Sequence, residues 1–417
     1  MPLKTVEPGG DKLELTGVKY QKMEGFGGCF NELGWIALSH LDEGKRREVF
    51  DEFFGPNGCR FNICRLPVGA NDYAAEWYSH DENDGDFTMD KFSIDRDRRI
   101  LIPYIKEALK RAPDLKLFAS PWSPPTWFKF PKAHNYGKII WKKEYLDAYA
   151  LYFVKFVQAY RDEGVTIHQI HIQNEPCADQ KFPSCLWTGG EMRDFIRDYL
   201  GPAFERNGLA TEIWLGTINS AGYDEFANTV LSDPEARRYV AGVGYQWDGK
   251  GAVQRTYESW PEIKLMQTEN ECGDGRNTWE YAVYIFTLFR HYIANGAGAY
   301  IYWNMVLETG GMSTWGWKQN SMLTVDPERR EVMRNPEFYV MKHFSHFVKR
   351  GAVRLGVKGH WAGNSVAFGN PGGGSVAVVY NPFPDARTLT LKDGEKEAGV
   401  QLAPGSFNTF AIKSDLR

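Results

Sequence analysis

Residues 172–176 read Ile-Gln-Asn-Glu-Pro, and residues 265–270 read Leu-Met-Gln-Thr-Glu-Asn. Each stretch is an apolar, strand-like run that ends in a glutamate, Glu175 in the first and Glu269 in the second. In a closed barrel of parallel strands, the carboxyl ends of all strands meet at one face. The two glutamates are therefore predicted to lie at one shared mouth, although they are far apart in the sequence.

The rest of the chain contains further segments of the same kind. Eight short apolar segments predict strands at residues 23–30, 60–66, 115–121, 167–173, 211–217, 240–247, 263–268 and 299–304. Apolar residues at three- and four-residue spacing predict helices between them, at residues 100–111, 144–161, 191–207 and 279–295. Eight strands alternating with helices indicate an α/β protein built as a (β/α)8 TIM barrel.

The two ends of the chain differ from the middle. After a predicted helix at 336–349, short apolar and polar runs alternate, and residues 365–368 and 375–380 flank a glycine-rich turn. That pattern predicts a β-hairpin, because no helix or Gly-Lys-Ser/Thr follows the glycines as a phosphate loop requires. Residues 388–391 and 407–412 predict further strands, and residues 12–20 are expected to add one to this small all-β unit.

Composition narrows the class of protein. The formal net charge is −4, without a basic block, so no nucleic acid partner is expected. No apolar run of 18 residues and no N-terminal apolar segment occurs, so the chain is expected to be soluble, either cytoplasmic or secreted with its signal absent.

The six cysteines lack zinc-site spacing. Cys177 and Cys185 either form a disulfide, if the protein is exported, or remain free thiols. The sequence leaves the oligomeric state open.

The two glutamates suit the hydrolysis of glycosides. In a retaining glycosidase one carboxyl group protonates the leaving oxygen and the other attacks the sugar, and the two lie about 5–5.5 Å apart. Glu175 is predicted to be the acid/base and Glu269 the nucleophile. Glu271 is the local alternative to Glu269, because it has the same strand parity, but it falls in the loop beyond the strand.

Other side chains near the strand ends are predicted to bind substrate. Asn174 is placed to hydrogen-bond a sugar 2-hydroxyl, and Arg65 to keep Glu269 ionised, with an ordinary buried ion pair as the alternative for Arg65. Aromatic rings stack well on sugars, and 15% of the residues are aromatic, although many of them must serve the core. The tryptophans near strand ends, each of which has packing as its alternative role, are Trp122, Trp127, Trp247, Trp303, Trp315 and Trp317.

No pattern for a metal or a cofactor is found, and none is expected. His168 and His171 are three apart on a predicted strand, so their side chains face opposite sides. The acidic stretch 81–90 lacks the spacing of a calcium loop and is interpreted as a solvated loop. Neither a Gly-x-Ser-x-Gly elbow nor a dinucleotide-binding fingerprint is present.

With these sites placed, the chain resembles glycoside hydrolase family 30, the family of the lysosomal glucosylceramidases, over nearly its whole length. The segments that carry the resemblance are Cys64-Arg65-Leu66-Pro67 through Asp72-Tyr73, Asp86-Phe87, Ser120-Pro121-Trp122 through Trp127, Asn174-Glu175-Pro176, Arg193-Asp194-Phe195-Ile196, Thr268-Glu269 and Tyr302-Trp303-Asn304.

The resemblance implies a barrel at residues 23–350 and a β-sandwich built from residues 1–22 and 351–417. It also implies a retaining mechanism without metal, in which Glu175 is the acid/base and Glu269 the nucleophile. The residues that match glycone-binding positions of the family are Asp72, Trp122, Asn174 and Trp303.

Two segments depart from the family pattern, and one of them is the nucleophile segment at residues 268–275, Thr-Glu-Asn-Glu-Cys-Gly-Asp-Gly. Glucosylceramidases have His-Trp-Tyr after the sixth strand, where this chain has Gln246-Trp247-Asp248. The predicted function is therefore a retaining β-glucosidase or β-1,6-glucanase that acts on a soluble carbohydrate. The alternatives are a glucosylceramidase, another glycone of the same family (β-xyloside, β-fucoside or β-galactan), or, more remotely, a non-catalytic carbohydrate-binding protein.

Overall fold

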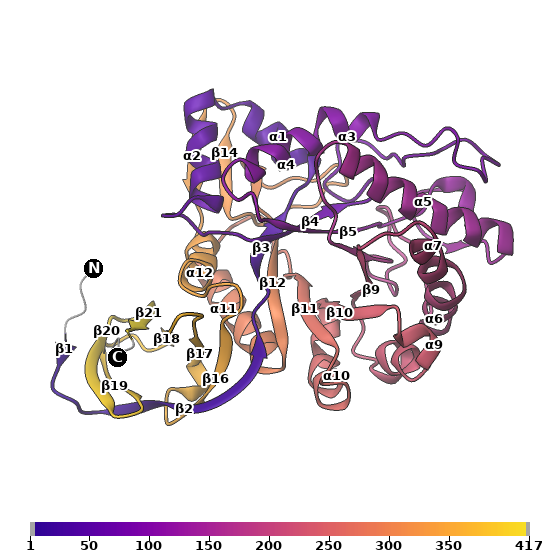
Figure 1. Cartoon of the computed structure of the whole chain (residues 1–417). Helices are drawn as coiled ribbons and strands as arrows, with labels where there is room; N and C mark the ends of the chain where they lie inside the picture. The colour runs from indigo at the N-terminus through magenta and orange to yellow at the C-terminus, as the bar shows by residue number, and fades with distance from the viewer. Residues whose placement is uncertain (1–4, 414–417) are drawn as a thin grey trace.

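Eight parallel strands close into a barrel in the order β10-β11-β12-β3-β4-β5-β8-β9 (Figure 1). The computed structural model describes residues 5–413. The barrel strands are β3 (Gly25–Cys29), β4 (Ile63–Pro67), β5 (Lys116–Ser120), β8 (Gln169–His171), β9 (Glu212–Ile218), β10 (Val240–Gln246), β11 (Lys264–Glu269) and β12 (Ala297–Asn304). Each predicted strand overlaps one of these, so the predicted (β/α)8 barrel is confirmed.

Helices surround the barrel and connect its strands (Figure 1). They are α1 (Glu32–Ser39), α2 (Glu43–Phe54), α3 (Asp95–Arg99), α4 (Leu101–Leu109), α5 (Lys143–Asp162), α6 (Gly189–Phe195), α7 (Gly201–Arg206), α8 (Thr229–Leu231), α9 (Pro234–Arg237), α10 (Val253–Ser259), α11 (Trp279–Ala294) and α12 (Pro336–Ser345). Within residues 5–413, every helix is too short or too polar to span a membrane.

The helix predicted at residues 191–207 is interrupted. It begins at the capping box of Thr188 and Glu191, but a π-helical turn, η2 (Ile196–Leu200), separates α6 from α7. Pro202 lies just beyond this turn. A proline inside a helix has no N–H to donate and its ring clashes with the carbonyl four residues earlier. The wider turn accommodates the proline without ending the helix.

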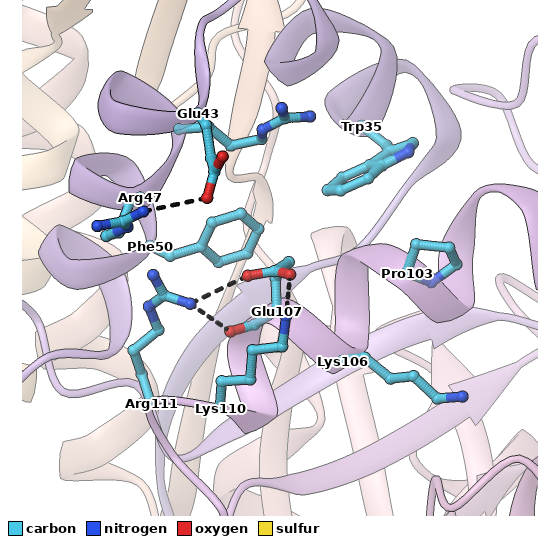
Figure 2. Close-up of a pocket in the computed structure, with 10 residues that line it drawn as sticks. Trp35, Glu43, Arg47, Phe50, Pro103, Lys106, Glu107, Lys110 and Arg111 are labelled. Carbon is cyan, nitrogen blue, oxygen red and sulfur yellow. Dashed lines mark hydrogen bonds and ion pairs between the residues drawn. The ribbon is translucent and has the colours of Figure 1, made fainter.

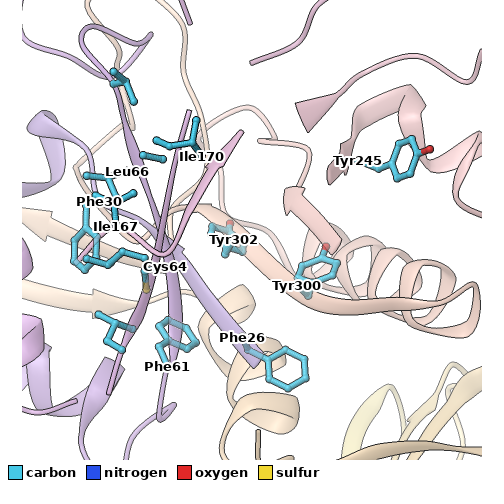
Figure 3. Packing of buried hydrophobic residues seen from close by; sticks show 14 of the residues in the cluster. Phe26, Phe30, Phe61, Cys64, Leu66, Ile167, Ile170, Tyr245, Tyr300 and Tyr302 are labelled. Carbon is cyan, nitrogen blue, oxygen red and sulfur yellow. The ribbon is translucent and has the colours of Figure 1, made fainter. Parts of the chain in front are cut away.

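The barrel interior is filled by side chains that alternate with those facing the helices. Ile63 faces inward and its neighbour Cys64 outward, as expected for a period of two residues. The inward-facing apolar residues are Ile63, Phe118, Trp214, Met266, Ala299 and Ile301. Figure 3 shows some of the outward-facing residues, among them Cys64, Leu66, Ile170, Tyr245, Tyr300 and Tyr302.

Two glycines of β10 make room for large side chains in this interior. A Cβ atom at Gly242 would lie 2.5 Å from the ring of Trp214, and one at Gly244 would lie 2.9 Å from Nδ1 of His171. Atoms cannot approach so closely, so a side chain at position 242 or 244 of β10 would clash with Trp214 or His171. The two glycines leave this part of the barrel interior to those two rings. The barrel is therefore a packed core and not a pore.

A second, eight-stranded sheet combines both ends of the chain, in the order β1-β20-β19-β2-β16-β17-β18-β21. Its strands are β1 (Thr5–Val6), β2 (Asp11–Lys22), β16 (Val353–Lys358), β17 (Ser365–Gly369), β18 (Ser375–Asn381), β19 (Arg387–Asp393), β20 (Lys396–Leu402) and β21 (Ser406–Ile412). Leu13, Val379 and Leu402, from separate parts of the sheet, share one apolar core. The sheet is thus folded on itself as the predicted β-sandwich, and the predicted β17–β18 hairpin is present.

The barrel and the sandwich share a continuous apolar interface. Alternate residues of β17 and β18 face in opposite directions, so Phe368 packs in the barrel-side core while Ala367 packs in the sandwich core. Phe344 of α12 stacks on Phe289 of α11 with ring centroids 4.2 Å apart, and contacts Phe368 edge-on at 6.5 Å. Aromatic contacts between α11, α12 and β17 therefore hold the two units together.

Two small sheets extend the loops at the mouth of the barrel. One contains β13 (Val306–Glu308), β14 (Leu323–Asp326) and β15 (Glu331–Arg334). The other pairs β6 (Lys129–Phe130) with β7 (Lys138–Ile139). The sequence predicted neither, because their strands are only two to four residues long and show no clear alternation.

Truncation of Phe344 is expected to destabilise the protein strongly. Phe344→Ala removes a fully buried ring at the interface and should lower the free energy of unfolding by about 3–5 kcal/mol. Tyr339→Ala on the same helix is the matched control, because Tyr339 is 48% exposed, and it should cost under about 1 kcal/mol. Urea unfolding of both variants checks this, and equal losses would contradict the assigned interface.

Candidate active site

A cavity of about 330 Å³ opens at the carboxyl-terminal ends of the barrel strands. Its residues follow or end β4, β5, β8, β9, β10, β11 and β12, which is the face where TIM barrels carry their active sites. The lining consists of Asp72, Trp122, Asn174, Glu175, Cys177, Ala178, Gln180, Phe182, Asn219, Trp247, Asp248, Glu269, Cys272, Gly273, Trp317, Lys318 and Gln319. The structure thus brings Glu175 and Glu269 into one cavity.

Glu175 reaches this cavity through an unusual backbone conformation. The strand β8 ends at His171, and the following backbone continues along β9, where the Glu175 N–H donates to the Thr217 carbonyl over 3.1 Å. Glu175 itself has a φ of 48°, in the left-handed region that residues other than glycine rarely adopt. Such conformations persist where surrounding contacts hold them, and they cluster at functional sites.

Glu269 reaches the cavity because β11 contains an irregularity. Along β11, Leu265 faces the helices and Met266 the barrel interior, so simple alternation would turn residue 269 toward the helices. The register with β10 shifts after Tyr245, so that Gln246 pairs with Glu269 and Thr268 is an extra residue. A β-bulge of this kind re-aims the next side chain. Glu269 therefore points to the barrel mouth.

Arg65 lies beneath the cavity and is fully buried. Its Nη1–H donates to Glu269 Oε2 over 2.7 Å, and its Nη2–H donates to Asn174 Oδ1 over 2.6 Å. Nε–H and Nη2–H also donate to Ser120 Oγ. The guanidinium lies 4.4 Å from the ring centroid of Trp122. Arg65 thus forms a buried ion pair with Glu269 and fixes Asn174 at the same time.

Gln246 and Trp247 connect the two glutamates. The Gln246 side-chain Nε2–H donates to Glu175 Oε1 over 2.9 Å, and its Oε1 accepts from Arg65 over 3.3 Å. The indole N–H of Trp247 donates to Glu269 Oε1 over 3.2 Å, from a residue whose φ is 48°. Both carboxylates are therefore held by donors from one short segment at the end of β10.

Burial and nearby charges affect the pKa values of the two glutamates differently. Burial, and then the nearby charge of Glu269, raise the pKa of Glu175 to about 8. Burial also raises the pKa of Glu269, but the charge of Arg65 and hydrogen bonds from Trp247 and Arg65 oppose that rise. Among residues 5–413 no cation forms an ion pair with Glu175, and the charge of Arg65 is only the last of the contributions to its pKa. At neutral pH the geometry therefore favours a protonated Glu175 beside an ionised Glu269.

Asp72 is the third carboxylate of the cavity. Burial raises its pKa to about 7, with Glu269 as the next contributor. Gln319 Nε2–H donates to its Oδ2 over 3.4 Å, whereas its buried Oδ1 has no partner among residues 5–413. A buried oxygen without a partner is costly unless a ligand completes its hydrogen bonding. Asp72 is therefore suited to accept a hydrogen bond from a substrate hydroxyl.

The predicted aromatic residues divide into two groups. Trp122, Trp247 and Trp317 line the cavity. Trp303 lies behind Trp122 at 5.3 Å and is 1% exposed, so it supports the wall. Trp315 stacks on Trp77, away from the cavity lining.

Two further residues considered from the sequence also lie outside the cavity lining. Trp127 stacks on Phe128 and donates its indole N–H to the Asp81 carbonyl, which is a packing role. Glu271, the alternative to Glu269, contacts Lys250 and Tyr284. The structure thus separates the two neighbouring glutamates by their partners.

Several lining residues were absent from the sequence prediction. Asn219 lies two residues beyond the fifth predicted strand and directly after β9, so the strand-end rule could have identified it. Phe182 and Gln319 lie in irregular loops with no periodic signal. Cys272 lies beside the nucleophile candidate, with Sγ 3.9 Å from Glu269 Oε1. Among the described residues all six cysteines are free, so Cys177 and Cys185 are not paired.

Comparisons with known proteins agree with this geometry. The family model "Glycosyl hydrolase family 30 TIM-barrel domain" matches residues 23–348, and "Glycosyl hydrolase family 30 beta sandwich domain" matches residues 351–410. The lysosomal acid glucosylceramidase of Mus musculus is 29% identical over 94% of this chain and 81% of its own. The endo-1,6-beta-D-glucanase of Neurospora crassa is 28% identical over 91% and 83%.

A solved structure shows the same architecture throughout. The crystal structure of SrfJ from Salmonella typhimurium superposes with a TM-score of 0.90 at 25% identity and covers 99% of this chain and 95% of that one. The barrel and the sandwich of this chain are therefore both present in that structure.

The raised pKa of the partly buried Glu175 should make stability depend on pH in a defined direction. Between pH 4.5, its ordinary pKa, and about pH 8 the unfolded chain releases a proton that the folded protein keeps, so stability falls as pH rises. Glu175→Gln removes this term and should be more stable than the wild type by on the order of 2–4 kcal/mol at pH 8, with little difference at pH 4. Guanidinium unfolding at both values measures it.

The matched control for this measurement is Glu144→Gln, because Glu144 is exposed on α5. This control should follow the wild type at both pH values. If Glu175→Gln also follows the wild type, Glu175 is ionised in the folded protein and the charge assignment of the pair is wrong.

Proposed function

Since this chain belongs to glycoside hydrolase family 30 and is a retaining O-glycosyl hydrolase, we propose that it cleaves β-glucosidic bonds in soluble β-glucosides or β-1,6-glucan. In this proposal Glu269 is the nucleophile and Glu175 the acid/base. The observation that carries the assignment is the placement of both carboxylates in one cavity, where Arg65 bonds Glu269 and Gln246 bonds Glu175.

In the first step Glu269 attacks the anomeric carbon as the bond to the leaving oxygen breaks. Glu175 gives its proton to that oxygen, so the leaving group departs as a neutral alcohol and Glu175 becomes ionised. The ion pair with Arg65 and the hydrogen bond from Trp247 hold one orientation of the Glu269 carboxylate. Burial of Glu175 provides the proton at neutral pH.

In the second step the roles of Glu175 reverse. The ionised Glu175 takes a proton from a water molecule, whose oxygen attacks the anomeric carbon and displaces Glu269. Glu175 returns to its protonated form and Glu269 to its ionised form. Two inversions at the same carbon retain the configuration of the sugar, and completion of the second step restores the charges that burial and Arg65 favour.

Asp72, Trp122 and Asn174 are proposed to hold the sugar ring at the cleaved bond. The unpartnered Oδ1 of Asp72 accepts from a hydroxyl, and Trp122 supplies an apolar face. Asn174 Oδ1 is occupied by Arg65 and Thr217. Its free amide N–H group therefore faces the substrate, where a bond to the 2-hydroxyl strengthens in the transition state.

The outer part of the cavity supports a sugar as leaving group. Asn219, Asp248 and Lys318 bring an amide, a carboxylate and an ammonium group to the lining. The ring of Trp317 packs edge-on against Phe182 at 5.8 Å and provides an aromatic face among these polar groups. Hydroxyl-rich saccharides match such a mixture, whereas the two alkyl chains of a ceramide require extended apolar surface.

Glucosylceramide is the second candidate substrate. The similarity to the mouse lysosomal glucosylceramidase, over 94% of this chain, favours it. Against it stand the polar outer lining and the segment Gln246-Trp247-Asp248, whose last residue has a largely exposed carboxylate at the mouth. Substrate preference distinguishes the two candidates directly.

Removal of Glu269 should abolish catalysis, and removal of Glu271 should not. Glu269→Gln is expected to lower kcat on an aryl β-glucoside by at least about 10³-fold. Glu271→Gln, the matched control, should stay within about tenfold of the wild type, because Glu271 contacts Lys250 and Tyr284 outside the cavity.

Azide distinguishes the two glutamates by the product that it forms. With Glu269→Gly it should yield the α-glucosyl azide, and with Glu175→Ala the β-glucosyl azide, since azide replaces the nucleophile in one case and water in the other. Near-normal turnover by Glu269→Gln, or the reverse pair of anomers, would contradict the assigned roles.

Substrate preference tests the proposed substrate class. The kcat/KM values for gentiobiose and for β-1,6-glucan oligosaccharides should exceed that for glucosylceramide in detergent micelles by at least about tenfold. Proton NMR of the first product should show β-glucose or a β-configured reducing end. A preference for glucosylceramide would overturn the substrate proposal and leave the catalytic assignment intact.

A further inference from the structure

A second cavity, of about 390 Å³, lies where the barrel meets the sandwich. Its walls come from α11 of the barrel and from β2, β16 and β17 of the sandwich, which lie side by side at this junction (Figure 1). Arg290 and Ala294 of α11 face Thr16, Tyr20 and Arg354 across it. None of its lining residues belongs to the catalytic cavity.

The shape of this cavity follows from how β2 pairs with β16. Val353 pairs with Lys22 and Val357 with Leu15, so β2 uses seven steps where β16 uses four. The extra residues bend β2 and place Thr16, Val18 and Tyr20 over Gly356. A Cβ atom at Gly356 would lie 2.5 Å from Thr16 Oγ1, so only glycine leaves this space open.

The charges in the cavity are all positive. Among the described residues that line it, Arg290 and Arg354 are the charged ones, and none is acidic. Within residues 5–413 neither arginine forms an ion pair, and the buried Nε–H of Arg290 has no hydrogen-bond partner. Partly buried guanidinium groups are usually paired with a carboxylate, so two arginines without an ion pair make this cavity suited to an anionic ligand.

Polar groups around the arginines are also available to a ligand. Ser365 lies in the cavity wall and is 3% exposed, and its buried Oγ has no hydrogen-bond partner. Arg354 donates from Nε to Gln21 Oε1 over 3.0 Å, and its guanidinium lies 3.6 Å from the ring centroid of Tyr20. Tyr257 is a further hydrogen-bond partner of Arg354, and among the described residues no carboxylate forms an ion pair with it. Burial lowers the pKa of Arg354, and a bound anion would offset that effect.

Another basic cavity of the protein, between α1, α2 and α4, shows the contrast. There, Arg47 pairs with Glu43 and both Lys110 and Arg111 pair with Glu107, as Figure 2 shows. Lys106 is within 3.3 Å of Glu163. Most cations of that groove are therefore paired with a carboxylate, in surface pairs that contribute little individually. Arg46 is the exception among the described residues, because it lies 5.8 Å from the ring centroid of Trp35 and forms no ion pair. The cavity at the junction lacks the compensating carboxylates.

We propose that the cavity between α11 and the β2–β16 strands is a binding site for a small molecule carrying a phosphate or carboxylate group. Arg290 and Arg354 bind the anionic group, since the planar guanidinium matches both oxyanions with paired hydrogen bonds. Thr16 and Ser365 supply hydroxyl partners, and Tyr20 covers the body of the ligand. The site does not rest on the proposed substrate, because it shares no residue with the catalytic cavity.

Calorimetric titration of the whole chain tests this site. The probes are inorganic phosphate, glucose 6-phosphate and glucuronate, with glucose as the uncharged comparison, all at constant ionic strength in a buffer without oxyanions. At least one anion should bind with one equivalent per chain and raise the melting temperature. Glucose should cause no such change at this site. Binding of the two phosphate compounds but not of glucuronate would identify a phosphate ligand, and binding of glucuronate alone would identify a carboxylate ligand.

Variants locate the binding. Arg290→Gln should weaken it at least about tenfold, and Arg290→Lys less, because lysine keeps the charge but not the paired geometry. Arg290 has no partner to lose, so the variant should fold and hydrolyse an aryl β-glucoside at the wild-type rate. Arg46→Gln, in the groove between α1, α2 and α4, is the matched control and should bind like the wild type.

Two results would overturn the site. One is the absence of saturable binding for all three anions in the wild type. The other is binding that Arg290→Gln and the Arg290→Gln/Arg354→Gln double variant leave unchanged, which would place the anion elsewhere. If the variants lose inorganic phosphate but still bind glucuronate or glucose 6-phosphate as the wild type does, the binding of those two sugars belongs to the catalytic cavity and not to this site.

Discussion

The ion pair between Arg65 and Glu269 is the interaction on which the active site depends. A guanidinium without exposed surface loses its hydration, and this cost is offset only when strong partners replace the water. Arg65 obtains them from Glu269, Asn174 and Ser120, and from the ring of Trp122. These partners come from strands far apart in the chain. The geometry of the reacting carboxylate is therefore set by the closure of the whole barrel.

The same burial makes the two glutamates proposed as catalytic residues differ in their tendency to ionise. In a low-dielectric cavity both carboxylates would prefer to be neutral, and one nearby cation is enough to decide which of them ionises. Arg65 lies on the side of Glu269, whereas Glu175 receives a neutral amide from Gln246. One carboxyl group that keeps its proton and one that does not are what the double displacement requires.

The two units of the fold use charge in opposite ways. The barrel mouth concentrates carboxylates around a single buried arginine, which suits a neutral, hydroxyl-rich substrate. At the junction with the sandwich, Arg290 and Arg354 lie together without a carboxylate. The aromatic interface of Phe289, Phe344 and Phe368 holds both units in one arrangement. A ligand at the junction would contact the barrel and the sandwich at once.

The sequence by itself determined the architecture and the chemical groups of the site. Short apolar runs identified all eight barrel strands, and 3.6-residue patterns identified helices between them. The strand-end rule brought Glu175 and Glu269 to one mouth. Such patterns depend only on neighbours along the chain. Only the tertiary structure decided their orientation. Simple alternation turns residue 269 away from the mouth, and the bulge at Thr268 exists because β11 must stay paired with β10. Likewise, Trp315 and Trp317 are equivalent in sequence, yet packing against Trp77 removes only Trp315 from the cavity. Register and packing are contacts between distant segments, and those form only when the barrel closes.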